Sequence, residues 1–172
     1  MKRKLLLMLL VLVFTAPVFA QKATTIWIVR HAEKDGTNPK AADPDLSEEG
    51  KMRAMALQKE LKGEKIDSIY TTNYKRTKLT ALPLADRMGI TLKTYNPAMQ
   101  KQLAEYILKH GEGKKYLVVG HSNTIQELII AFGLEKPVKD LTEEDYDYLF
   151  EVTIKGDKKE VKVNHYGKRT SS

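Results

Sequence analysis

The chain has 172 residues, no cysteine, and 29 Lys and Arg against 22 Asp and Glu, which gives a formal net charge of +7. A chain without cysteine cannot form disulfides, thiolate nucleophiles, cysteine zinc sites or a lipid anchor on cysteine. Because its cations are scattered among acidic residues, the charge favours a solvated surface over a nucleic-acid-binding stripe.

Residues 1–20 have the pattern of a secretory signal peptide. Three cations, Lys2, Arg3 and Lys4, precede an apolar run, and small residues up to Ala20 offer a cleavage site. The run is shorter than the roughly 20 residues of a membrane span, although an uncleaved anchor remains an alternative.

Removal of this segment leaves 26 Lys and Arg against 22 Asp and Glu, a formal charge of +4. The remaining residues, 21–172, are enough for one domain with a sizeable core. We therefore expect an exported bacterial protein, periplasmic or secreted, with no stable membrane insertion after cleavage.

Residues 24–33 contain an apolar run that ends at Arg30 and His31. No polar residue interrupts residues 26–29, which is typical of a strand buried on both faces of a parallel sheet. Ligands bind beyond the carboxyl ends of such strands, so a cation and an imidazole there form a candidate anion site.

A loop, a helix and a strand follow. Residues 34–46 are rich in Gly, Asn, Pro and Asp, a composition that predicts a loop beside the candidate site. Ser47 can cap a helix whose apolar residues recur at helical spacing until Gly63 ends it. Residues 66–72 then predict a short strand with two isoleucines as its apolar anchors.

The next predicted helix begins near Asn73, a candidate cap, and ends at Gly89. Pro83 should kink or divide this helix, because proline lacks the amide donor of the helical ladder. The side chains expected to face the core are Leu79, Leu82 and Met88.

The second half of the chain continues the alternation of strands and helices. A third strand is predicted over residues 91–95, and Asn96 can cap a helix that ends near His110. Residues 115–120 predict another buried apolar strand, followed by a helix over residues 124–132.

The pattern changes after Pro137 to two strands, residues 148–154 and 160–166, joined around Gly156 and Asp157. This spacing predicts an antiparallel hairpin at a sheet edge. The order of elements predicts an α/β fold, a three-layer α/β/α sandwich with a mostly parallel sheet and this C-terminal hairpin.

Side chains that can bind phosphate follow three of the predicted strands. Arg30 and His31 follow the first, Arg76 the second, and His121 the last parallel strand. If these strands are neighbours, their carboxyl ends meet at one crevice. Guanidinium groups bind phosphate oxygens in pairs, and nearby positive charge keeps an imidazole neutral and nucleophilic. The sequence therefore predicts a phosphoryl-transfer site.

These motifs resemble those of the histidine phosphatase superfamily, also called phosphoglycerate mutase-like. The family's opening Arg-His-Gly motif is present as Arg30, His31 and Ala32. Its second arginine, before a Thr-Ala pair, is similar to Arg76, and its second histidine to His121. The resemblance covers nearly all of the chain after the signal peptide.

The resemblance implies that His31 becomes phosphorylated and that water completes the hydrolysis. The residues that would bind the phosphoryl group are Arg30, Arg76 and His121. It implies a phosphoric monoester hydrolase that needs no metal or other cofactor and acts on a small phosphorylated substrate.

The family's general acid has no clear equivalent in this chain. Many members have Glu or Asp after the third strand, where residues 95–98 contain neither. Members of the acid phosphatase branch have Asp after the second histidine, where this chain has Ser122. Glu33 and Glu105 are the nearest possible proton donors. An enzyme without a donor should be restricted to substrates with good leaving groups.

Other polar residues favour structural roles. His110 lies at a predicted helix end, where a cation can satisfy terminal carbonyls, and His165 lies in the last strand. Asp43 and Asp45 could join the histidines in a metal site, but their spacing matches no known ligand set.

The predicted function is thus an exported, metal-independent phosphatase. The alternatives are a non-catalytic phosphate-binding or phospho-ligand-binding protein of the same fold, a structural envelope protein with a basic surface, and a mutase. Export disfavours a glycolytic mutase, because its substrate is cytosolic.

Overall fold

The structure, a computed structural model, describes residues 21–170, so the predicted signal peptide at residues 1–20 lies outside the described part. One six-stranded sheet has the order β3-β2-β4-β1-β5-β6. Its strands are β1 (Thr24–Arg30), β2 (Ser68–Thr71), β3 (Lys93–Thr94), β4 (Lys115–Gly120), β5 (Tyr148–Lys155) and β6 (Lys158–His165). The helices are α1 (Glu48–Leu61), α2 (Lys75–Met88), α3 (Gln100–His110) and α4 (Ile125–Ala131).

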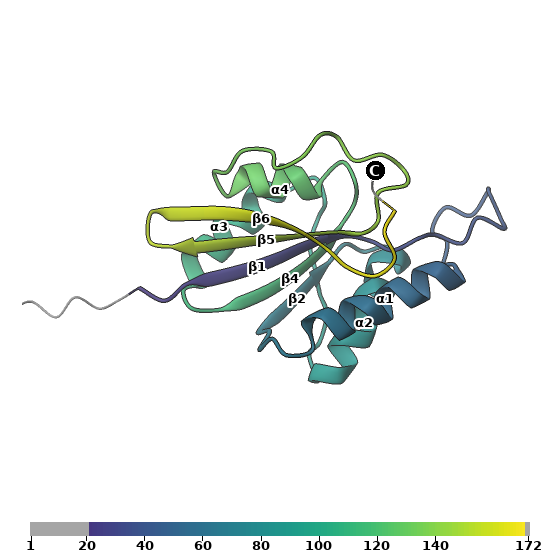
Figure 1. The fold of residues 1–172 in the computed structure, drawn as a ribbon, viewed down its shortest axis with the longest axis horizontal. Coiled ribbons are helices and arrows are strands. Elements are labelled where there is room, and N and C mark those ends of the chain that lie inside the picture. The colour runs from purple at the N-terminus through teal and green to yellow at the C-terminus, as the bar shows by residue number, and fades with distance from the viewer. Residues whose placement is uncertain (1–20, 171–172) are drawn as a thin grey trace, which may run out of the picture.

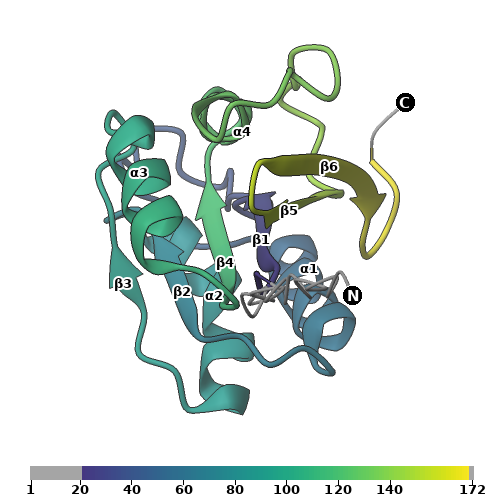
Figure 2. The same cartoon turned by 90° about the vertical axis from the view of Figure 1, so that its left-hand side faces the viewer.

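Helices cover both faces of this sheet (Figures 1 and 2). β1 to β4 are parallel, whereas β5 and β6 run antiparallel, with β6 at the edge. One apolar cluster joins the sheet to α3 and α4, and a second joins it to α1 and α2. The three layers and the terminal hairpin confirm the fold class predicted from the sequence.

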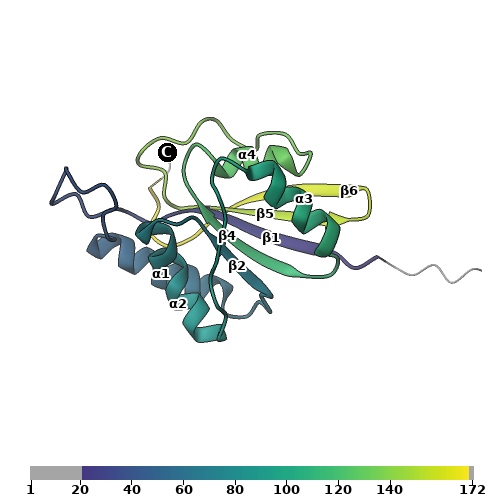
Figure 3. The same ribbon diagram turned by 180° about the vertical axis from the view of Figure 1, so that it is seen from behind.

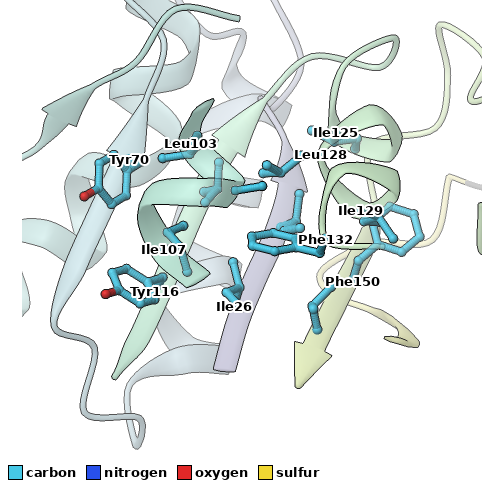
Figure 4. Close-up of a cluster of buried hydrophobic side chains, with 14 of the residues drawn as sticks. Ile26, Tyr70, Leu103, Ile107, Tyr116, Ile125, Leu128, Ile129, Phe132 and Phe150 are labelled. Atoms are coloured by element: carbon cyan, nitrogen blue, oxygen red, sulfur yellow. The ribbon is translucent and has the colours of Figure 1, made fainter. Parts of the chain in front are cut away.

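The side chains of β1 alternate between the two layers of helices. Ile26 and Ile28 pack beneath α3 and α4, in the cluster shown in Figure 4. Trp27 and Val29 pack on the opposite face, toward α1 and α2. None of these four side chains is more than 5% exposed, so β1 is buried on both faces as predicted.

The pairing of β1 with β4 brings their carboxyl ends level. Arg30 lies opposite Gly120, and the His31 amide donates to the Gly120 carbonyl at 2.9 Å. His31 and His121 therefore emerge from neighbouring strands at the same edge of the sheet. The loop that follows β1 projects beyond this edge, and the C-terminal segment returns to it (Figure 3).

α2 differs from the sequence prediction in its cap and in its buried face. Asn73 does not cap the helix; instead the Lys75 amide donates to the Asp43 carboxylate, at 3.0 and 3.1 Å to its two oxygens. Leu82 is 40% exposed, because the helix turns Leu84 to the core in its place. The prediction that Leu82 faces the core was therefore wrong.

Pro83 lies inside α2 but does not divide it, since the helix continues from Lys75 to Met88. The Pro83 carbonyl accepts a hydrogen bond from the Gln58 side chain of α1 at 2.8 Å, which ties the two helices together. Leu79 and Met88 are partly buried against apolar clusters, in line with the sequence pattern.

α3 begins at Gln100, later than predicted. The Asn96 side chain accepts the Ala98 amide at 3.0 Å, and the Asn96 carbonyl accepts the Met99 amide at 2.9 Å. Asn96 thus closes a turn before the helix and does not cap its first residue. β3 is also shorter than predicted and contains two residues.

Other boundaries agree closely with the sequence patterns. Ser47 accepts the Gly50 amide at 3.1 Å and caps α1. Gly89 ends α2 with φ 66°, and Gly156 occupies the hairpin turn between β5 and β6 with φ 59°. Both glycines adopt the left-handed conformation that these positions require. Within residues 21–170 no helix is both long enough and apolar enough to cross a membrane.

Candidate active site

A pocket of about 510 Å³ opens at the carboxyl ends of β1 and β4. It brings together all four side chains that the sequence placed at strand ends. Strand order explains this convergence, because β1 and β4 are neighbours and α2 begins shortly after the adjacent β2. The residues that line the pocket are Arg30, His31, Lys34, Tyr74, Arg76, Pro97, Ala98, His121, Ser122, Asn123, Thr124, Glu127 and Glu143.

His31 directly follows β1 and is 4% exposed. Its Nδ1 lies 2.8 Å from the Ala32 carbonyl oxygen, which can only accept, so Nδ1 carries the proton of the neutral ring. Nε2 therefore keeps a free lone pair. Burial lowers the pKa of His31 to about 3, and the charges of Arg30 and Arg76 act in the same direction. At neutral pH this ring is an uncharged nucleophile.

His121 lies beside His31, with their ring centroids 5.4 Å apart. Its Nδ1 is 3.5 Å from Nη2 of Arg76, which can only donate, so Nδ1 accepts and Nε2 carries the proton. Nε2 donates to the Thr72 hydroxyl at 3.0 Å. Burial, followed by the charge of Arg76, lowers the pKa of His121 to about 4. Both pocket histidines are thus neutral at pH 7.

Arg76 lies in the first turn of α2, and its side chain is 15% exposed. Its guanidinium stacks 4.2 Å from the centre of the Tyr74 ring, and Nη1 lies 3.4 Å from the Asp43 carboxylate. Its Nε is buried and has no hydrogen-bond partner in the described part of the chain. A fixed guanidinium with an unused donor is suited to binding an oxyanion.

The loop between α4 and β5 fixes the orientation of Arg30, which is 2% exposed. Nη1 of Arg30 donates to the carbonyls of Thr142, at 2.7 Å, and Asp145, at 3.3 Å. Nη2 lies 3.1 Å from the Glu143 carboxylate. The Tyr146 ring centre lies 4.1 Å from the guanidinium carbon. As in Arg76, Nε is buried without a partner among the residues described.

The structure places neither of the two predicted proton donors in the pocket lining. Glu33 instead receives hydrogen bonds of 2.7 to 2.9 Å from Arg53 of α1, which packs against the chain just after β1. Glu105 is 63% exposed on α3, with an oxygen 3.9 Å from Lys101 Nζ. Both carboxylates therefore have positions that suit structural or surface roles.

Two other carboxylates, Glu127 and Glu143, line the pocket and were not selected by the sequence analysis. Glu127 lies in the first turn of α4, close behind the strand end that carries His121. That spacing could have identified it, since helices that start at such strand ends direct their first turns toward the site. Glu143 lies in an irregular loop, where no periodic pattern marks a residue as facing the site.

The remaining histidines lie outside the pocket lining. His110 Nδ1 donates to the Tyr106 carbonyl at 3.0 Å, near the end of α3. His165 lies at the end of β6, with Nδ1 2.9 Å from the buried Asp147 carboxylate. Across residues 21–170 no three His, Asp or Glu side chains are grouped so that they could hold a metal ion.

Comparison with known proteins identifies related sequences. A model of the histidine phosphatase superfamily (branch 1) matches residues 26–100. Phosphoserine phosphatase 1 of Hydrogenobacter thermophilus is 48% identical over 67 residues, which are 37% of this chain and 32% of that protein. A second protein of that organism is 27% identical over 148 residues, which are 82% of this chain and 68% of its own length. The aligned region thus spans about a third of the first relative.

Solved structures share the fold at low sequence identity. A mycobacterial glucosyl-3-phosphoglycerate phosphatase in complex with VO3 has a TM-score of 0.66 and 14% identity, over 82% of this chain and 97% of that one. The protein histidine phosphatase SixA in complex with tungstate has a TM-score of 0.63 and 15% identity, over 83% and 95% of the two chains. The chain thus has the fold of these phosphatases, and its residues 26–100 match the histidine phosphatase superfamily.

Proposed function

We propose that this protein is a metal-independent phosphatase that hydrolyses a small phosphomonoester, or a related phosphoryl compound, through a phosphohistidine on His31. The observation that carries this proposal is the neutral, buried His31 ring, whose Nε2 is free in a pocket shared with two guanidinium groups. The family match over residues 26–100 and the phosphatase name of a relative support the same class of reaction.

The reaction has two displacement steps. In the first, the Nε2 lone pair of His31 forms a bond to phosphorus while the bond to the leaving oxygen breaks. Arg30 and Arg76 line the pocket and balance the negative charge of the transferred group. In the second step, water attacks phosphorus, the phosphorus–nitrogen bond breaks, and inorganic phosphate leaves.

His121 changes its hydrogen bonding when the phosphoryl group binds. In the ligand-free site its Nδ1 is an acceptor facing Arg76. A phosphate dianion beside it favours the protonated ring, which donates from both nitrogens. His121 thereby becomes a third donor to the phosphoryl group while it keeps its hydrogen bond to Thr72.

A colorimetric assay tests the proposed reaction. The purified protein is mixed with p-nitrophenyl phosphate in the presence of EDTA. Steady turnover is expected, with a loss of at least about 10³-fold in His31→Ala, and acid-free trapping should find phosphate on His31. Phosphate on another residue would contradict the mechanism. Binding of phosphate without any turnover would instead favour a non-catalytic phosphate-binding protein.

We also propose that the enzyme acts outside the cytoplasm, on the basis of the signal-peptide pattern at residues 1–20. Fractionation of cells that express the full chain should recover a processed protein outside the cytoplasm. Unprocessed chain in the cytoplasm would contradict export. Phosphoserine is a first substrate to test, because it is named in the activity of the relative described above.

A further inference from the structure

The buried position of His31 determines where a leaving group must lie. In an in-line displacement, the leaving oxygen is on the side of phosphorus opposite to the nucleophile. His31 is almost completely buried, so the leaving group points away from it, toward the opening of the pocket. A proton donor for the leaving oxygen must therefore be an exposed residue of the pocket lining.

Two carboxyl groups meet this condition, Glu127 and Glu143. The ammonium and phenol groups of Lys34 and Tyr74 also line the pocket, but such groups are much weaker acids than a carboxyl group. Positioned proton transfer is most effective when the donor loses its proton readily near the working pH. The protonated His121 ring uses its two donors on Thr72 and the phosphoryl group, so the choice is between the two glutamates.

Their partners distinguish the two glutamates. Glu143 lies 3.1 Å from Arg30 Nη2 and 3.9 Å from Lys34 Nζ, so its carboxylate is already engaged in fixing two cations of the site. The side chain of Glu127 has no hydrogen bond or ion pair with any residue of the described chain. The Glu127 carboxyl group is therefore not needed to hold another side chain, and it can turn toward a leaving oxygen at the opening of the pocket.

The core fixes the backbone that carries Glu127. Ile125, Leu128 and Ile129 of α4 are at most 1% exposed and pack into the cluster beneath the helix (Figure 4). This packing leaves Glu127 on the exposed side of α4, beside the pocket. The side chain is thus free to turn, while its Cα is held in place.

We propose that Glu127 is the proton donor to the leaving group, an inference that rests on the phosphatase function proposed above. As the bond between phosphorus and the leaving oxygen breaks, the Glu127 proton passes to that oxygen and releases a neutral alcohol. The carboxylate then takes a proton from the water that attacks the phosphohistidine. The second step thus restores the protonated Glu127 side chain and the free His31 ring.

A series of leaving groups tests this role in the intact protein. Glu127→Gln should lower kcat/KM at least about 10²-fold for an alkyl phosphate such as glycerol phosphate or phosphoserine, which needs a proton on departure. The same variant should change kcat/KM for p-nitrophenyl phosphate less than about fivefold, because nitrophenolate leaves without a proton.

Glu143→Gln is the matched comparison at the same pocket, and it should affect both substrates by the same factor. The assignment would be overturned if Glu127→Gln lowered kcat/KM equally for both substrates or for neither. It would also be overturned if the variant only raised KM, and only for substrates with an amino group. If the wild-type protein does not turn over even p-nitrophenyl phosphate, it is the phosphatase function that fails. Thermal unfolding of each variant shows whether it is folded.

Discussion

At the scale of single residues, the site depends on side chains whose geometry matters as much as their charge. Arg76 combines a carboxylate neighbour, an aromatic stacking partner and an unused Nε donor. A lysine in its place would keep the charge but could neither stack as a plane nor bind two oxygens at once. The position therefore requires the guanidinium shape.

We accordingly expect Arg76→Lys to lose about 2 kcal/mol of transition-state stabilisation, which is about 30-fold in kcat/KM. Steady-state kinetics with an aryl phosphate would measure this loss. Arg87→Lys, at the exposed end of the same helix, is the control and should leave kcat/KM unchanged. Near wild-type activity in Arg76→Lys would show that Arg76 does not bind the phosphoryl group.

At the scale of elements, the C-terminal segment is part of the support for the site. The Tyr146 amide donates to the Thr170 hydroxyl at 3.1 Å, and that hydroxyl donates to Asp147 at 3.0 Å. Tyr146 in turn stacks on Arg30. On the other side, Arg53 binds the Lys168 carbonyl at 3.0 Å and the carboxylate of Glu33, two residues after His31.

Thr170→Val removes both hydrogen bonds of the hydroxyl and should loosen Tyr146 beneath Arg30. Only the bond from the Tyr146 amide holds Tyr146, and its loss costs about 1 kcal/mol. Inhibition by vanadate should therefore weaken about fivefold, with a matching rise in KM. Titration of vanadate against turnover measures the effect. Thr170→Ser keeps the hydroxyl and should restore binding. Unchanged inhibition by vanadate in Thr170→Val would show that the C-terminal segment does not support the site.

The sequence predicted regular elements better than the loops that complete the site. Buried strands such as β1 and β4 can be recognised in the sequence by their uninterrupted apolar runs. The residues that follow these runs, His31 and His121, were therefore predicted to lie at the site. The buried side of α2 was misjudged because three leucines in that helix compete for the core, and only packing against α1 selects among them. The contacts to Glu143 and Tyr146 arise in an irregular loop, where spacing carries no information about direction.

At the scale of the whole molecule, the two pocket histidines link catalysis to stability. The folded state keeps His31 neutral down to about pH 3 and His121 down to about pH 4, whereas an unfolded chain protonates histidine near pH 6.5. Below pH 6.5 the unfolded state therefore binds more protons than the folded state. The stability present above pH 6.5 is lost progressively as the pH falls toward these lowered pKa values.

We expect the free energy of unfolding to decrease between pH 6.5 and pH 5, with a limiting slope of about 1.4 kcal/mol per pH unit from His31 alone. Urea titrations at several pH values in this interval measure the slope. His31→Asn removes one of the two groups and should flatten the dependence. A slope that the variant leaves unaltered would show that His31 is not the buried neutral group described above.

The central place of β1 in the sheet also governs when the chain can fold. Thr25 pairs with Lys115 on one side and with Thr153 on the other, so both neighbours of β1 are synthesised long after it. Closing such long stretches of chain is entropically costly, and domains rich in distant pairings fold slowly. A fragment that ends before β4 has neither the strand that positions His121 nor the loop that holds Arg30. No amino-terminal fragment that stops before the last hairpin should therefore show enzymatic activity, because it lacks the strand that pairs with β1.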